Sequence, residues 1–525
     1  MRDTHPSTKW LYTLFIGAAV VIAPMVWFWE FTVDDAWITG RVAHHIATGR
    51  GYRFNPDGPV VDAVTPLGWA FVLAPFAASG PGAALVAAKW LGALSWLGAA
   101  LSLFAKLARL TWRAIIIAAL LIATSMPIAA WAVAGMETGV VLALATLGLG
   151  EGWTARLALG LAAGLRPELL PWAFIVGSAR SALMTGTALD RARRVALASV
   201  PLLLPFLVVA VTRTVIFGAA YPLAVLAKPS DASSGLRYAL GALAFTGAAW
   251  TSLGIRSLAA LRATPKSLPS PDGRSASHSF VAPPRRTSVR LVVSPRTARV
   301  SLPGSVQDLG VALKPFTRVL VAAALVHALV LVAVGGDWMP IYRLFVPVLP
   351  SLVLAGAELA QTEPLWKVVM RSGVALFAAA LLVLARGQAV RGVGVQRAEL
   401  IHEARPLLAS ARRIATLDVG WVGAATPAHI VDLAGVTDPT VARLPGGHTT
   451  KRLPDSFLES RDIDALVLLA DYAGTWPNHH FARVVEARIV TLPGAERFRA
   501  VGWVPLLGTR QAYVVARRMS EAQAD

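Results

Sequence analysis

Two adjacent aspartates, Asp34 and Asp35, follow the first apolar stretch that is long enough to cross a bilayer. An ionised carboxylate is costly to hold at a membrane boundary without a partner, so such residues usually have a function there. One carboxylate can act as a general base for an acceptor hydroxyl while its neighbour orients that hydroxyl. Both can share a divalent cation with a phosphate, or they can be hydrated residues that end a helix. The polar residues around the pair favour a functional role.

The residues after the pair predict an amphipathic helix that lies parallel to the membrane. Arg41 and His45 are four residues apart and so share one face of it. Arg41 is a candidate substrate-binding residue. His44 and His45 have no third ligand at a recognisable spacing, which favours structural histidines over metal ligands.

A second polar segment, GGDWMPIYRLFVPVLP, covers residues 335–350. Its two glycines permit a bend at a membrane boundary, and Asp337 follows in the turn. Arg343 then lies inside an apolar helix, where an arginine needs a partner. That partner is either an external anion or Asp337, and a purely structural salt bridge is the competing interpretation.

Further polar islands interrupt or end apolar runs at 135–138, 166–168 and 221–229. Each one alone is more typical of a loop than of a site. Together they supply cations and carboxylates that can meet at one depth in the membrane, which suits a ligand with a charged head and a lipid tail. These candidate substrate-binding residues are Glu137, Arg166, Glu168 and Lys228.

The composition indicates a polytopic membrane protein. Of 525 residues, 55% are hydrophobic and only 15% are charged, and the mean hydropathy is +0.59. The net charge of +19 is concentrated between apolar runs, as in cytoplasmic loops, so we expect no nucleic-acid partner. The absence of cysteine excludes disulfides, thiolate metal sites and cysteine nucleophiles.

About eleven transmembrane helices are expected, because each span needs roughly 20 apolar residues. The first of them is long and ends in Trp27-Phe28-Trp29-Glu30, so we interpret it as a retained anchor and not as a signal peptide. The clear candidates are 10–30, 83–105, 114–132, 195–217, 236–261, 315–334, 341–360 and 366–386, and the less clear ones are 66–79, 137–150 and 157–178, the last being one distorted helix or two short ones.

Lysine and arginine counts predict a cytoplasmic N-terminus. They place an external catalytic loop at 31–65, a flexible basic cytoplasmic loop at 262–314 with one weak strand near RLVVSP, and everything after 390 outside. One conflict follows from this topology. If both 66–79 and 83–105 cross, the basic residues Lys106, Arg109 and Arg113 would be external.

After residue 390 the apolar runs shorten to strand length and alternate with helical stretches, which predicts a small α/β soluble domain. We therefore divide the chain into a membrane domain, 1–389, and an extracytoplasmic α/β domain, 390–525. Asp418, Asp432 and Asp438 follow expected strands, where turn formation is favoured over a metal or sugar site. The expected strands are Ile414 to Leu417, Ile430 to Leu433, Ala465 to Leu469 and Ala512 to Ala516.

Several motifs in this order resemble bacterial GT-C membrane glycosyltransferases, in particular the AftB-like arabinofuranosyltransferase group. They span about 31–440 and are DDAWI, GRGYRFNPDGPVVDAVTPLGW, WAVAGMET, LRPE, YPLAVLAK, GGDWMPIYRLFVPVLP and VDLAGVTDP. Where the family carries Glu-Gly before a threonine, this chain has Asp62-Ala63-Val64-Thr65, so the likeness does not extend to the identity of the sugar.

The resemblance implies a GT-C-like fold and an inverting enzyme that takes a sugar from a polyprenyl-phosphate donor on the extracytoplasmic face. The acceptor would be an envelope glycan or lipid. The family's essential aspartate maps onto Asp34 or Asp35, one of which would be the base. Lys228, Arg343 and Arg166 would hold the departing phosphate.

Two other functions stay open from the sequence. One is a transporter or flippase of lipid-linked sugars, although the chain shows no duplicated halves with matching broken helices. The other is a non-catalytic envelope-assembly protein, which would leave Asp34 and Asp35 without a role.

Overall fold

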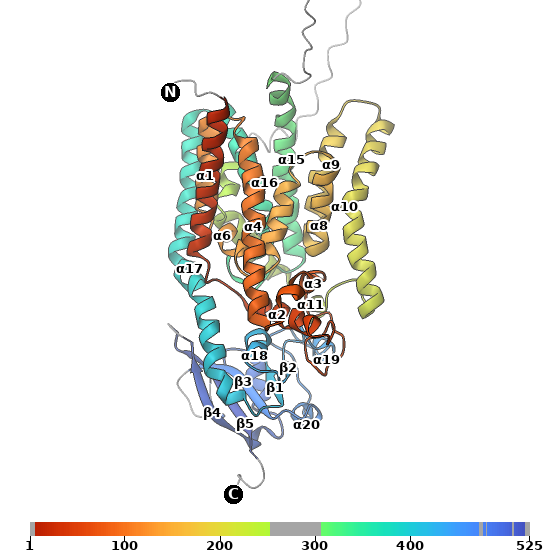
Figure 1. Ribbon diagram of the computed structural model, residues 1–525, viewed down its shortest axis with the longest axis vertical. Coiled ribbons are helices and arrows are strands. Elements are labelled where there is room, and N and C mark those ends of the chain that lie inside the picture. Colours follow the sequence, from red (N-terminus) through yellow and green to blue (C-terminus); the bar gives the residue numbers. More distant parts are fainter. Residues whose placement is uncertain (1–5, 253–305, 472–475, 479, 507–508, 520–525) are drawn as a thin grey trace, which may run out of the picture.

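A bundle of long apolar helices and a small sheet domain stand end to end in the protein (Figure 1). The computed structural model describes residues 6–252, 306–471, 476–478, 480–506 and 509–519. Helix α1 begins at the end of the bundle far from the sheet domain (Figure 1). The bundle contains α1 (Pro6–Trp27), α4 (Pro81–Leu107), α5 (Trp112–Ala123), α6 (Met126–Ala132), α7 (Thr138–Leu147), α8 (Gly152–Leu165), η2 (Pro167–Leu169), α9 (Leu170–Leu183), α10 (Ala188–Phe217), α12 (Ala232–Phe245), α13 (Ala248–Ser252), α15 (Val306–Ala333), η3 (Pro340–Val348), α16 (Leu349–Thr362) and α17 (Leu365–Leu408).

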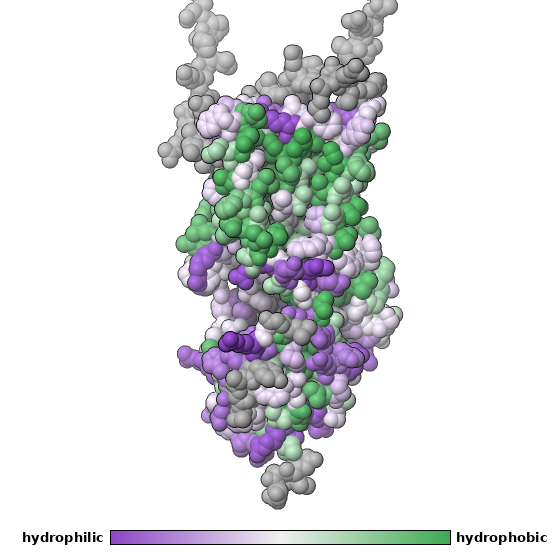
Figure 2. Space-filling view, turned by 90° about the vertical axis from the view of Figure 1, so that its left-hand side faces the viewer, coloured by the Kyte–Doolittle hydropathy of each residue, from purple (hydrophilic) through white to green (hydrophobic). Residues whose placement is uncertain are grey.

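The outer surface of the bundle is apolar. Figure 2 shows a broad hydrophobic band over the helices, with hydrophilic residues gathered near its ends and over the sheet domain. On α10, Leu204, Leu207, Val208 and Val211 are all exposed. A surface of this kind is stable in lipid and not in water, so the predicted membrane protein is confirmed.

Six helices are long and apolar enough to cross a membrane within the described residues, or seven if the pair α5 and α6, bent by 60°, counts as one span. The expected number of about eleven is not confirmed. The difference lies mainly in short helices: α8 and α9 each have 14 residues and α7 has 10. At 1.5 Å per residue, none of them reaches across the roughly 30 Å of hydrocarbon.

The segment 157–178 consists of two short helices that form a hairpin. Arg166 precedes Pro167 and has an extended backbone, with φ −135° and ψ 92°, as the residue before a proline prefers. Helix α8 ends there, and α9 returns to the end from which α8 came, because Arg180 of α9 pairs with Glu151 at 2.5 Å. The hairpin therefore carries its polar turn into the middle of the bundle.

The segment 66–79 does not cross the membrane. It forms only α3 (Trp69–Leu73) and η1 (Ala74–Phe76), which pack beside α2 (Asp34–Ala47) at the junction with the sheet domain. Helix α4 starts next to α2, where Gly40 touches Pro81. It ends near the start of α1, where Lys9 Nζ donates to the Leu110 carbonyl at 2.6 Å. Lys106 and Arg109 thus lie at the N-terminal end of the bundle, as the charge rule requires.

The predicted C-terminal α/β domain is present. Its mixed sheet has the order β2-β1-β3-β5-β4, with β1 parallel to β2 and β3, and β5 antiparallel to β3 and β4. All four expected strands form, whereas β4 was not expected. The domain contains β1 (Arg413–Thr416), α18 (Val419–Ala425), β2 (His429–Asp432), α19 (Pro439–Ala442), α20 (Phe457–Ser460), β3 (Ala465–Asp471), α21 (Val484–Ile489), η4 (Ala495–Arg497), β4 (Phe498–Pro505) and β5 (Gln511–Arg518), while α11 (Leu223–Ala227) lies at its junction with the bundle.

Two expected boundaries differ from the structure. Helix α17 runs through residue 390 without a break and joins the bundle to the sheet domain (Figure 1). Residues 306–314, expected in the basic loop, begin α15. The rest of that loop from 262, with its weak strand, lies outside the described residues.

Glycines let helix α4 approach the end of α6 and the start of α7 closely. A Cβ at Gly92 would collide with the carbonyl oxygen of Ala132, whereas a Cβ at Gly98 of the same helix would meet nothing within 4 Å. We expect Gly92→Leu to destabilise the bundle by about 1–3 kcal/mol through overpacking. Thermal unfolding in detergent measures this effect, and Gly98→Leu is the matched control. Equal stability of the two variants would contradict the packing described here.

Candidate functional site

A cavity of about 850 Å³ lies where the bundle meets the sheet domain. We call it the interface cavity. Its walls come from α2, the 63–66 and 220–230 loops, α10, the turn before α9, the end of α15, and Val436 of the sheet domain. The charged side chains that line it are Asp35, Arg166, Glu168, Arg213, Lys228, Asp337 and Arg343. Segments far apart in the sequence therefore bring most of the predicted site residues to one place.

Arg343 is held between two carboxylates at the floor of this cavity. Its guanidinium lies 2.7 Å from Asp337 and 3.6 Å from Asp35. The preceding residues Ile341 and Tyr342 adopt φ values of 54° and 55°, a left-handed backbone that is rare for a β-branched residue. This turn directs Arg343 toward the carboxylates, and the Tyr238 hydroxyl fixes it by accepting from the Leu344 N–H at 2.9 Å. Asp337 is thus one of the two partners that the sequence offered for Arg343, and Asp35 is a partner that it did not suggest.

Arg166 and its neighbours form a second charged group. Arg166 makes a close ion pair with the fully buried Glu137 and lies 3.8 Å from Glu168. Glu137 lies behind Arg166 and does not line the cavity, so its role is to balance and orient that arginine. The turn before α9 thereby presents one cation, Arg166, and one carboxylate, Glu168, to the cavity, and the turn before α7 supports them from behind.

Lys228 follows α11 and reaches the cavity without a salt bridge among the residues that the structure describes. Its ammonium group lies 5.5 Å from the centre of the Trp338 ring. A lysine with no carboxylate partner, next to a cavity, is available to an anionic ligand.

Sequence reasoning missed the pair of Arg213 and Asp62. Arg213 Nε donates to the Asp62 carboxylate at 2.8 Å, and both side chains are buried. The pair fastens α10 to the first loop, and Arg213 forms part of the cavity wall. The available signal was the arginine inside the apolar run 195–217, which requires a partner by the same argument as Arg343.

The two adjacent aspartates separate into different environments. Asp35 lines the cavity, and its side chain keeps a quarter of its surface exposed. Asp34 is buried and accepts hydrogen bonds from the backbone N–H groups of Gly420 and Trp421, at 2.8 and 2.9 Å. Asp34 therefore joins α2 to α18 of the sheet domain, and only Asp35 stands where a substrate can reach it.

A buried charge network surrounds Asp34 on the domain side. Asp418 accepts from the Tyr513 hydroxyl at 2.6 Å and pairs with Arg483 at 2.8 Å. Burial, together with the negative charge of Asp418, raises the pKa of Asp34 to about 7, while Arg397 opposes that rise. The contact between α2 and the sheet domain therefore depends on whether the Asp34 carboxyl group is ionised.

Arg41 does not lie in the interface cavity, so its position does not favour the predicted substrate contact. Its guanidinium donates to the backbone carbonyls of Phe54, Gly423, Thr426 and Ala428. A side chain with its donors used in this way clamps the loop and the sheet domain together. Both histidines are structural: the Nδ1 atoms of His44 and His45 lie 2.8 and 2.9 Å from the carbonyl oxygens of Ala77 and Arg53.

The strand-end aspartates of the sheet domain have structural partners. Asp432 accepts from the Thr437 N–H at 2.6 Å and closes a turn. Asp438 caps α19 and pairs with Arg461 at 2.7 Å. Among the described residues, no three His, Asp or Glu side chains group as metal ligands do.

The cavity also has an apolar side made by two membrane helices. A ligand with a charged head near Asp35 and Arg343 would place an attached lipid chain along these helices. The residues concerned are Phe206, Val209 and Ala210 of α10 and Val330, Ala333 and Val334 at the end of α15.

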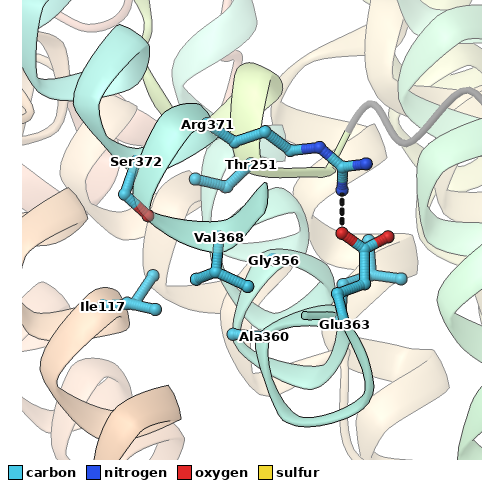
Figure 3. Close-up of a pocket in the computed structure, with 9 residues that line it drawn as sticks. Ile117, Thr251, Gly356, Ala360, Glu363, Val368, Arg371 and Ser372 are labelled. Atoms are coloured by element: carbon cyan, nitrogen blue, oxygen red, sulfur yellow. Dashed lines mark ion pairs between the residues drawn. The ribbon is translucent and has the colours of Figure 1, made fainter. Parts of the chain in front are cut away.

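A second, far smaller cavity lies in the bundle between α5, α13, α16 and α17 (Figure 3). It has a volume of about 10 Å³, which suits a single water molecule. Arg371 and Glu363 close it with an ion pair of 2.7 Å. It is a packing detail of the bundle and has no room for a substrate.

Residues 384–516 match the family model described as "Domain of unknown function (DUF8728)", which covers the end of α17 and most of the sheet domain. No curated protein and no solved structure matches the chain.

The contact of Asp34 predicts a pH-dependent junction. Because the docked state raises the pKa of Asp34 above its ordinary value of 3.8, that state binds a proton more tightly than the separated state. Docking is therefore strongest at acid pH and weakens as the pH rises toward 7. We expect the Gly420 and Trp421 amides to exchange with deuterium at least about tenfold faster at neutral than at acid pH, after correction for intrinsic rates.

Asp34→Asn should abolish this pH dependence, because an amide does not titrate. The matched control is Asp462→Asn, which removes an exposed carboxylate that pairs with Arg518 at 2.7 Å within the sheet domain. If deuterium exchange of the Gly420 and Trp421 amides keeps the same pH dependence in the Asp34→Asn variant, Asp34 is not the group that makes docking depend on pH.

Proposed function

We propose that the protein is a GT-C-type inverting glycosyltransferase that moves a sugar from a polyprenyl-phosphate donor to an envelope glycan or lipid. The observation that supports this proposal best is the interface cavity, in which an accessible carboxylate, Asp35, stands among cations and beside apolar helices. The motif resemblance to the AftB-like group supports the same chemistry.

The reaction needs a base and an anion-binding site. Asp35 takes the proton of the acceptor hydroxyl, and the oxygen attacks the anomeric carbon of the donor. The bond from that carbon to the phosphate oxygen breaks, and the polyprenyl phosphate leaves with the electron pair. Lys228 and Arg343 stabilise the negative charge on the leaving phosphate, with Arg166 beside them. A single displacement inverts the anomeric configuration.

The position of the cavity matches the proposed topology. In a bacterial plasma membrane with the N-terminus in the cytoplasm, the cavity and the sheet domain face the extracytoplasmic side. The lipid tail of the donor would then lie against α10 and α15, within the bilayer. A divalent cation shared by Asp35 and the phosphate is compatible with this scheme, but the transfer step does not require one.

Replacement of the proposed base should stop transfer. We expect Asp35→Asn to lower the transfer rate by at least about 100-fold, because the amide cannot accept the proton. Purified protein in nanodiscs would be assayed with a panel of polyprenyl-phosphate sugars and acceptor glycans. Asp190→Asn is the matched control, since Asp190 lies at the start of α10, remote from the cavity.

The same assay separates the enzyme from a transporter. Donor binding without turnover, unchanged in Asp35→Asn, would favour a flippase of lipid-linked sugars. Full transfer activity in Asp35→Asn would refute the assignment of the base.

Loss of the unpaired lysine should weaken donor binding. We expect Lys228→Gln to raise the KM for the donor by roughly 10- to 100-fold, as the loss of one charged hydrogen bond predicts. Lys228→Arg should recover most of the affinity. Lys106→Gln, at the N-terminal end of the bundle, is the control, and an equal effect from it would argue against a local role of Lys228.

A further inference from the structure

Trp338 is unusual among the tryptophans near the site because its side chain is open to the surroundings. It is 53% exposed, whereas Trp131, which packs beside Arg343, is fully buried. Trp338 directly follows Asp337, a residue of the cavity lining. Trp338 is not itself a lining residue, but its ring centre lies 5.5 Å from the ammonium group of Lys228, which lines the cavity, so the ring stands next to the interface cavity.

The sheet domain places His448 against this ring. The two ring centres are 6.1 Å apart, with 34° between their planes. Lys228 lies over the same tryptophan at 5.5 Å. An aromatic surface is thus bordered by a cation, an imidazole and the Asp337 carboxylate, which come from three separate segments of the chain.

The loop that carries His448 is firmly anchored. The buried Lys451 donates to the carbonyls of Ala442 and Leu444 at 2.8 and 3.1 Å, which closes the loop on itself. Arg488 of α21 donates to the Thr450 and Lys451 carbonyls. Such anchoring fixes where His448 stands, as a binding residue requires.

The electrostatics show that His448 belongs to the same site. Partial burial and the positive charge of Lys228 lower the pKa of His448 to about 4, and the charges of Asp337 and Asp35 act on it in the opposite direction. The imidazole is therefore neutral at pH 7, with one nitrogen that donates and one that accepts. A neutral imidazole can therefore donate a hydrogen bond to one hydroxyl group and accept a hydrogen bond from another.

We propose that Trp338 and His448 form a subsite that binds a sugar ring of the acceptor glycan, beside Asp35. A sugar ring has an apolar face of C–H groups and an edge of hydroxyls. The Trp338 ring suits the face, while His448 and Asp337 suit the hydroxyls. The inference rests on the proposed function and deepens it, because it assigns to the sheet domain a part in acceptor recognition.

The experiment varies acceptor and donor separately, with full-length protein in nanodiscs. We expect Trp338→Ala to raise the KM for the acceptor by about tenfold, the size expected when stacking of one ring is lost, and to leave the KM for the donor unchanged. Trp338→Phe should restore most of the affinity, and His448→Ala should act in the same direction as Trp338→Ala. The matched control is Trp366→Ala, because Trp366 is 64% exposed with Lys367 at 5.4 Å, but lies at the opposite end of the bundle.

Two outcomes would overturn the subsite. Equal changes in both KM values would assign Trp338 to the donor sugar or to the fold as a whole. No change in either would mean that Trp338 only anchors the protein at the membrane interface, as exposed tryptophans often do.

A binding measurement keeps this test separate from the proposed function. Saturation-transfer NMR with methyl glycosides of hexopyranoses and pentofuranoses does not depend on turnover. A signal from the wild type that is lost in Trp338→Ala would support the subsite even if no donor were used. Transfer activity in the wild type, with glycoside binding equal in both proteins, would support the enzyme and refute the subsite.

Discussion

The contact between Asp34 and the start of α18 is the interaction on which the site depends. A buried carboxylate is tolerated here because two backbone N–H groups satisfy it, and those groups belong to the other domain. The four carbonyls bound by Arg41 make the same junction more specific. The interface cavity lies at this junction, where Val436 of the sheet domain completes a lining that otherwise comes from the bundle and its loops. Separation of the domains would open the cavity at Val436. It would also expose the Asp34 carboxylate and the N–H groups of Gly420 and Trp421, which are hydrogen-bonded to each other only across the junction.

The geometry of a helix explains how two adjacent aspartates take different roles. Successive side chains on an α-helix point about 100° apart. When Asp34 at the start of α2 faces the sheet domain, Asp35 must face elsewhere, and it meets Arg343 and the cavity. The same contact that docks the domain thereby fixes the direction of the carboxylate that we propose as the base. Docking and catalysis would share one short segment of the chain.

Sequence patterns predicted the local features and failed at contacts between distant segments. The long apolar runs predicted α1, α4, α10 and α15, and the strand-length runs predicted four of the five strands. The pattern of β4, FRAVGWVP, keeps few residues buried, so its hydrophobic signal is weak. Charged residues inside apolar runs marked Arg166 and Arg343 as candidates, and the structure places both in the lining of the interface cavity. The role of Arg41 was missed because its partners lie more than 380 residues further along the chain, where no periodicity connects them.

The protein has fewer long transmembrane helices than expected for the same physical reason that it has a polar interface cavity. Broken helices leave polar backbone at membrane depth, which lipid cannot satisfy and which is tolerated only where it is buried in protein or lines a cavity. The turns at Glu137 and Arg166, and the left-handed backbone before Arg343, are such breaks, and each delivers a charged side chain to the interface cavity or directly behind it. A bundle of uninterrupted spans would satisfy its backbone internally and would leave these charges to meet lipid. The irregular helices are therefore the means by which this apolar protein holds a polar site within reach of the membrane.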